Sequence, residues 1–126
     1  MVTGILICHG QLAFELIRTV EKILGPADSL LPFSNEGLSP KTLYEKVMDA
    51  LVANDVKQAV IMVDLRGGSC WMTAKMINKE RSTFRVLSGV NVPMLVSFLT
   101  KHKQLSFKEI VETMAADAHR GVVNER

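Results

Sequence analysis

Short apolar runs alternate along this chain with longer segments in which apolar residues recur at helical spacing. Four of the short runs have the length and composition of strands, over residues 4–8, 30–33, 59–63 and 84–90. The spacing predicts helices over residues 11–24, 40–54, 94–101 and 106–119, and a further helix that opens at residues 67–69. On that further helix, Met72, Met76 and Ile77 are expected to share one side.

Turn and capping residues support these boundaries. Gly25 and Pro26 end the first helix, because glycine commonly follows a helix C-terminus and proline cannot continue one. Ser39 has the side chain of an N-cap, and Pro40 suits the first helical position. Pro32 has no N–H group, so it predicts an edge position for the second strand.

Strand and helix alternate four times, which predicts an α/β fold with a parallel four-stranded sheet and helices on both faces. In such sheets, ligands bind beyond the carboxyl ends of the strands. The residues at those ends are Cys8-His9-Gly10, Ser34-Asn35, Asp64 to Ser69, and Gly89-Val90-Asn91. Any chemistry of this chain is therefore expected among them.

The chain has 126 residues, of which 48% are hydrophobic and 22% charged, values that predict one globular domain over residues 1–126. Its net charge of +2, without any block of like charge, argues against a nucleic-acid-binding protein. Cys8 and Cys70 do not form the loop framework of a disulfide scaffold, and no CxxC motif or Cys/His cluster indicates zinc. No segment has the pattern of a membrane span or signal peptide, so a cytoplasmic location is expected.

His9 and Asp64 are the two candidate chemical groups at the strand ends. His102 and His119 lie in polar contexts near helix ends and are expected at the surface. If the first and third strands are neighbours, the Asp64 carboxylate lies beside His9 and accepts one ring N–H, which leaves the other nitrogen nucleophilic. Structural roles are also open: a lone histidine serves many of them, and Asp64 can simply cap the turn that follows it.

The segment Gly67-Gly68-Ser69 opens a helix directly after this turn. Glycines let the backbone approach an anion closely, and the N–H groups and dipole of a helix start favour a phosphate. Ser69 can add a hydroxyl donor and also serve as the N-cap, and Arg66 can add positive charge nearby. A plain strand-to-helix turn is the alternative. There is no P-loop lysine and no GxSxG nucleophile motif, so the combination with His9 suggests a phosphohistidine site.

Three segments in register carry a family resemblance: Gly4 to Gly10, Val63 to Ser69, and Ser88 to Leu95. The sequence resembles the enzyme IIA domain of the mannose-type sugar phosphotransferase system (PTS), a single type-4 EIIA domain over residues 1–126. The resemblance implies that His9 accepts a phosphoryl group from the phosphocarrier protein HPr and passes it to a IIB partner. It implies that Asp64 orients the His9 imidazole and that Gly67, Gly68 and Ser69 lie at the phosphoryl group, with no metal or cofactor.

The same resemblance implies a homodimer in which a C-terminal strand is exchanged between subunits and runs antiparallel to the rest. Gly121-Val122-Val123 is the candidate for that strand. Apolar residues such as Leu12, Phe14 and Trp71 are expected near the rim of the partner interface, although Phe14 and Trp71 are also candidate core residues, and the core is the favoured position for Phe14.

Three departures from the family pattern bear on the partner. Cys8 stands where the family commonly has threonine or serine, Leu65-Arg66 replaces a pair that often includes threonine or tryptophan, and Cys70-Trp71 replaces a proline-aromatic pair. We expect a stand-alone IIA subunit that serves a sugar transporter, a dihydroxyacetone kinase system or regulation alone. The alternatives from other classes are a non-enzymatic sensor that binds a regulator, and a small hydrolase or metal enzyme that uses His9 and Cys8.

Overall fold

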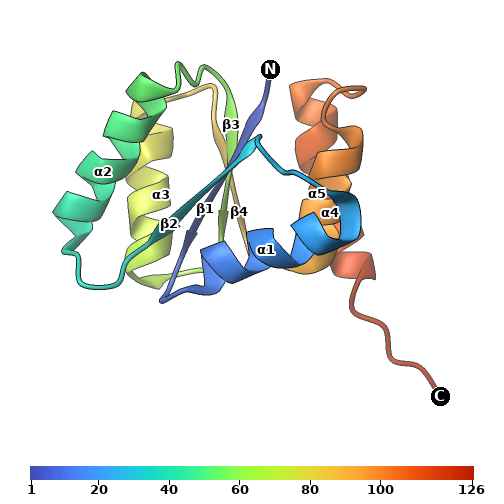
Figure 1. The fold of residues 1–126 in the computed structure, drawn as a ribbon. Helices are drawn as coiled ribbons and strands as arrows, with labels where there is room; N and C mark the ends of the chain where they lie inside the picture. The colour runs from blue at the N-terminus through green and yellow to red at the C-terminus, as the bar shows by residue number, and fades with distance from the viewer.

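A computed structural model describes residues 1–126 as one parallel β-sheet between two layers of helices (Figure 1). The strands are β1 (Thr3–Cys8), β2 (Leu30–Ser34), β3 (Ala59–Val63) and β4 (Arg85–Ser88). The helices are α1 (Leu12–Leu24), α2 (Pro40–Ala53), α3 (Gly68–Glu80), α4 (Val92–Lys101) and α5 (Phe107–Arg120). The predicted α/β class is confirmed. The fourth strand is shorter than the expected residues 84–90, because pairing with β3 spans only Arg85 to Ser88.

The strand order is β2-β1-β3-β4, and all three pairings are parallel. The edge position expected for the strand that contains Pro32 is confirmed. Helices α2 and α3 cover one face of the sheet, and α1, α4 and α5 cover the other (Figure 1). This order makes β1 and β3 neighbours, so the loops that follow them meet at one edge of the sheet.

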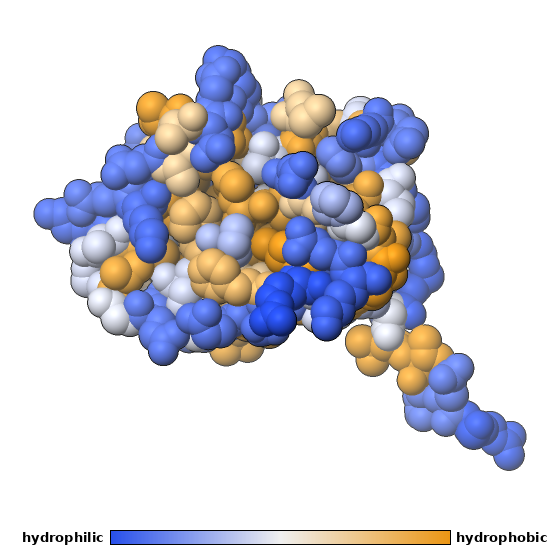
Figure 2. Space-filling model, viewed as in Figure 1, coloured by the Kyte–Doolittle hydropathy of each residue, from blue (hydrophilic) through white to orange (hydrophobic).

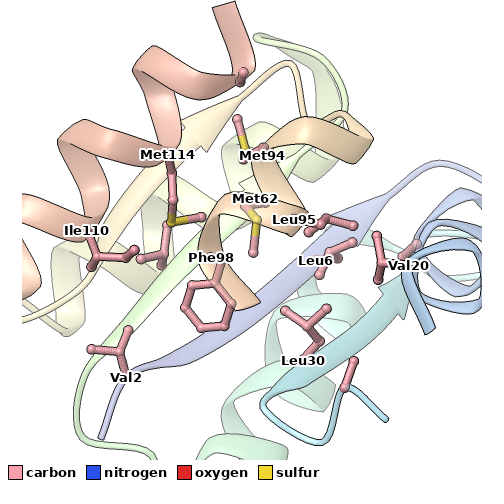
Figure 3. Close-up of a cluster of buried hydrophobic side chains, with 14 of the residues drawn as sticks. Val2, Leu6, Val20, Leu30, Met62, Met94, Leu95, Phe98, Ile110 and Met114 are labelled. Carbon is pink, nitrogen blue, oxygen red and sulfur yellow. The ribbon is translucent and has the colours of Figure 1, made fainter. Parts of the chain in front are cut away.

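The side chains of the two central strands alternate between two separate cores, as the pleat requires. Leu6 and Met62 contribute to a core with α1, α4 and α5, in which Phe98 is fully buried (Figure 3). Ile5 and Ile61 contribute to the opposite core, with α2 and α3. Burial on both faces explains why these strands are continuously apolar in sequence.

Gly4 in β1 leaves the space into which Phe98 packs. A Cβ atom at this position would lie 2.6 Å from Leu30 Cδ2, 3.0 Å from Met62 Cε and 3.2 Å from Phe98 Cε2. We expect the Gly4→Ala substitution to lower the free energy of unfolding by about 1–3 kcal/mol, the usual effect of overpacking a core. Urea denaturation measures this change, with Thr3→Ala in the same strand as a control that adds no atoms. An unchanged midpoint for Gly4→Ala would show that the core has room there.

The buried face of α3 differs from the expected one. Met72 and Met76 are 57% and 47% exposed, whereas Ile77 is fully buried together with Cys70 and Ala74. The prediction that Met72, Met76 and Ile77 share one side is therefore wrong. The helix packs on the sheet through its smaller side chains, which allow a close approach, and its two large methionines face outward.

His102 is also placed differently from the expectation. It is 7% exposed, and its ring stacks on Phe98 with 4.5 Å between the ring centroids. Burial is the main cause that lowers its pKa, and Lys103 adds to the effect. The expected surface position is wrong for His102 and confirmed for His119, which is exposed. His102 directly follows α4, on the side of the apolar face of that helix, so its ring packs against the buried Phe98.

Helix α5 is fixed to α4 near its end, and the chain then leaves the body of the molecule. Asp117 accepts hydrogen bonds from Lys101 Nζ and Ser97 Oγ, both at 2.7 Å, and pairs with Arg120. The hydrogen bond from Lys101 is the largest cause that lowers the pKa of Asp117, to about 2, and the bond from Ser97 adds to it. Residues 122–126 form no helix or strand within the chain and extend away from it (Figure 1).

Candidate phosphoryl-transfer site

The loops after β1 and β3 bring His9 and Asp64 into direct contact. Ile7 pairs with Val63 in the sheet, so the residues that follow them leave the same edge side by side. His9 Nδ1 lies 3.0 Å from Oδ2 and 3.2 Å from Oδ1 of Asp64. The main-chain N–H of His9 also donates to Asp64 Oδ2, at 3.0 Å. Asp64 thus holds both the backbone and the ring of His9.

This contact decides which ring nitrogen is free to react. An ionised carboxylate only accepts hydrogen bonds, so the proton of the neutral imidazole resides on Nδ1. Nε2 then carries the free lone pair. The His9 side chain is 47% exposed and that of Asp64 only 16%, so solvent reaches the ring while the carboxylate that holds it is mostly covered.

Asn35 connects the site to a third strand. The Gly10 N–H donates to Asn35 Oδ1, and Asn35 Nδ2 donates to Ser69 Oγ, both at 3.3 Å. The amide therefore links the loop after His9 to the first turn of α3. The sequence places Asn35 at a strand end but indicates no role for it, since only the sheet order shows that its loop lies beside the one that holds His9.

The start of α3 has no side-chain cap. Its N-cap is Gly67, whereas Ser39, Asn91 and Ser106 cap α2, α4 and α5 through their side-chain oxygens. Gly67 and Gly68 have φ angles of +90° and +85°, which favour glycine. Ser69 is the second residue of the helix, so its expected role as N-cap is wrong. The first N–H groups of α3 lack a side-chain acceptor, which suits them to bind an anion.

Arg66 lies on the turn before α3, where it contacts an aromatic ring. Its guanidinium carbon is 5.9 Å from the ring centroid of Trp71. Stacking of this kind holds an arginine side chain against the surface. The positive charge of Arg66 therefore stays close to the first turns of α3.

Both cysteines near the site are buried free thiols on opposite faces of the sheet, Cys8 in the core with α1 and Cys70 in the core with α3. Burial raises the pKa of Cys8 to about 12 and that of Cys70 to about 11, and the negative charge of Asp64 adds to both shifts. Each is therefore a protonated thiol at neutral pH. This argues against Cys8 as the nucleophile of a hydrolase.

A family model described as "PTS system fructose IIA component" matches residues 4–115, which include the three strand ends of the site. The chain belongs to this family. Curated relatives of this enzyme IIA chain are named mannose-, fructose- and sorbose-specific components, so the resemblance to the mannose-type IIA family is confirmed.

Two relatives show how the IIA chain compares in length. The mannose-specific EIIAB component of Escherichia coli K12 is 32% identical over 118 residues, which cover 90% of this chain and 36% of that protein. The chain thus spans about a third of the length of that relative. The fructose-specific EIIA component of Bacillus subtilis is 27% identical, over 92% of this chain and 81% of that protein.

Solved structures support the fold of the IIA chain. A phosphotransferase system component EIIA from Streptococcus agalactiae superposes with a TM-score of 0.91 and 21% sequence identity, covering 98% of this chain and 97% of that one. A mannose/sorbose-specific IIA subunit from Enterococcus faecalis gives a TM-score of 0.80.

None of the five helices combines the length and hydrophobicity that crossing a lipid bilayer requires.

Proposed function

We propose that this IIA chain is a phosphocarrier in which His9 accepts a phosphoryl group from phospho-HPr and passes it to a IIB partner. The observation that carries the proposal is the double contact of Asp64 with the ring and the main chain of His9. It orients the imidazole with Nε2 toward solvent, where a protein donor can reach it. As a carrier that exchanges phosphoryl groups with HPr, the chain is expected to work in the cytoplasm.

The transfer is an in-line displacement between two histidines. The lone pair of His9 Nε2 attacks the phosphorus of the phosphohistidine of HPr, an N–P bond forms at Nε2, and the N–P bond of the donor breaks. The phosphorylated ring keeps its proton on Nδ1 and is cationic, so the Asp64 carboxylate stabilises it through a charge-assisted hydrogen bond. Such transfers need positioning and charge stabilisation more than covalent assistance.

The phosphoryl oxygens would meet the start of α3. Its first N–H groups have no side-chain cap, and the dipole of the helix favours negative charge there. Ser69 Oγ, held by Asn35 Nδ2, supplies a hydroxyl donor beside them. We therefore assign His9 and Asp64 to the transfer, and Gly67, Gly68 and Ser69 to phosphoryl binding.

Leu12 and Phe14 are candidates for the rim of the partner interface. They are 41% and 38% exposed, which favours the rim over the core for Phe14. Interfaces with transient protein partners are modest in size and include exposed apolar residues of this kind among their contacts. Both follow His9 closely in sequence, so a partner that reaches Nε2 can contact them.

The function is tested by incubating the purified chain with enzyme I, HPr and phosphoenolpyruvate. The expected result is one acid-labile phosphoryl group per chain, which then moves to a IIB protein when one is added. Absence of labelling would contradict the carrier role. Labelling that no IIB protein removes would favour the regulatory alternative, and transfer to a dihydroxyacetone kinase subunit would favour that system.

We further propose that residues 1–126 act as a single IIA domain that forms a homodimer by exchange of its C-terminal strand. Val122 and Val123 are 82% and 64% exposed, and Figure 2 shows hydrophobic surface at the base of the extended tail. The outer sides of β2 and β4 have no neighbouring strand within the chain. Pairing of the tail with such an edge on a second copy covers both features.

Truncation tests the exchange. A chain that ends after Arg120 is expected to be monomeric by light scattering and to unfold at a lower temperature than the full chain. A chain that ends after Val123 keeps the apolar residues and is the matched control, expected to remain a dimer. A monomeric full-length chain would contradict the exchange.

A further inference from the structure

A third ligand-bearing side chain lies beside His9 and Asp64. The buried thiol of Cys70, in the first turn of α3, has its sulfur within 4.8 Å of a ring nitrogen of His9 and a carboxylate oxygen of Asp64. The three groups come from the loop after β1, the end of β3 and the start of α3. The sheet order thus brings together residues that are far apart in sequence.

The donor set is typical of zinc. Thiolate sulfur, imidazole nitrogen and carboxylate oxygen bind Zn²⁺ at about 2.3, 2.0 and 2.0–2.2 Å, which places tetrahedral ligands about 3.3–3.6 Å apart. The Cys70 sulfur lies within 4.8 Å of the other two ligand atoms and reaches that range by an approach of about 1.2 Å at most, while the Nδ1–carboxylate separations of 3.0 and 3.2 Å are already close to it. The exposed side of His9 provides the entry path and leaves the fourth position to water.

We propose that His9, Asp64 and Cys70 form a site for a thiophilic divalent cation such as Zn²⁺, and that the bound cation prevents phosphoryl acceptance. The first part stands on the geometry alone. The second part rests on the proposed function, because it concerns the same imidazole.

The inhibition follows from the chemistry of the ring. Nδ1 is the nitrogen that faces Asp64, so the cation binds there in place of the Nδ1 proton. The ring proton moves to Nε2, and the Cys70 thiol releases its proton to solvent when the sulfur coordinates. Nε2 then has no lone pair with which to attack phosphorus. Metal binding and phosphorylation thus become mutually exclusive.

Calorimetric titration of the full-length, metal-free chain with Zn²⁺ tests the site without any phosphate present. We expect one Zn²⁺ per chain, with binding weakened by more than about 100-fold in Cys70→Ser and Cys70→Ala, beyond the loss typical of an outer-shell partner. His9→Ala is expected to weaken it similarly. Cys8→Ser removes the other buried thiol and is the matched control, expected to bind like the unmodified chain.

A spectroscopic titration with Cd²⁺ reports the thiolate directly. The ligand-to-metal absorption of a cadmium–sulfur bond is expected in the unmodified chain and in Cys8→Ser, and not in either Cys70 variant. Circular dichroism verifies the fold of each variant. Three results would each overturn the site. The unmodified chain could bind no stoichiometric metal, both folded Cys70 variants could bind the metal as tightly as the unmodified chain, or the Cys8→Ser control could lose as much metal affinity as the Cys70 variants.

The inhibition is measured separately, in single-turnover transfer from purified phospho-HPr. The quantity compared is the transfer rate with Zn²⁺ divided by the transfer rate with a chelator. A ratio well below one for the unmodified chain, rising toward one in Cys70→Ala, supports the proposal. Zinc binding without any transfer in chelator would mean that the proposed function fails and the metal site stands. Transfer that proceeds at the same rate with bound zinc would overturn the inhibition.

Discussion

Replacement of His9 by alanine is expected to reduce labelling by phospho-HPr to background. The reason is that His9 is the imidazole that Asp64 holds through Nδ1 beside the uncapped start of α3, which leaves its Nε2 free to attack phosphorus. The fold should be unaffected, because the His9 side chain is 47% exposed and its main-chain N–H bond to Asp64 is retained. Acid-labile radiolabel per chain, measured after gel filtration, gives the result.

His119→Ala is the matched control for this substitution. His119 is also exposed, but it lies near the end of α5, in the last turn before the tail. Its removal should leave labelling at one phosphoryl group per chain. Full labelling of the His9 variant would show that another group accepts the phosphoryl.

Substitution of Asp64 is expected to slow phosphoryl acceptance without abolishing it. A hydrogen bond to a charged group contributes about 1.5–3 kcal/mol, so Asp64→Ala should lower the transfer rate by roughly 10- to 100-fold. Asp64→Asn keeps one oxygen that accepts from Nδ1, while it loses the negative charge and the second accepting oxygen. The transfer rate of Asp64→Asn should therefore lie between the rates of Asp64→Ala and the unmodified chain, on the order of 10-fold below the unmodified chain.

Rapid-quench measurements with phospho-HPr provide these rates, with Asp49→Asn on the exposed side of α2 as the control. A structural role alone would lower the melting temperature of the Asp64 variants and leave the rate of the folded fraction unchanged. Equal rates for the asparagine variant and the unmodified chain would remove charge stabilisation from the mechanism.

The main elements of the fold could be predicted because their sequence signals are local. Continuous apolar runs at residues 4–8 and 59–63 indicate strands buried on both faces, and capping residues such as Ser39 mark helix starts. The contact of His9 with Asp64 depends in addition on the sheet order, which these signals do not contain. The sequence predicts this contact only on the condition that β1 and β3 are neighbours, and the structure meets that condition.

Other features depend on packing that no local pattern expresses. The burial of His102 follows from its stacking on Phe98 after the end of α4. The outward position of Met72 and Met76 follows from the close approach of Ala74 to the sheet. The amide of Asn35 makes two hydrogen bonds that connect three loops of the site. In the sequence, Asn35 has the pattern of an ordinary turn residue.

The orientation of the His9 ring is tested most directly by long-range proton–nitrogen NMR of the imidazole, recorded before and after phosphorylation by HPr. A proton on Nδ1 in the free chain, and a phosphorus–nitrogen coupling at Nε2 in the phosphorylated chain, are the expected observations. A phosphoryl group on Nδ1, or a free ring that carries its proton on Nε2, would contradict the role given to Asp64.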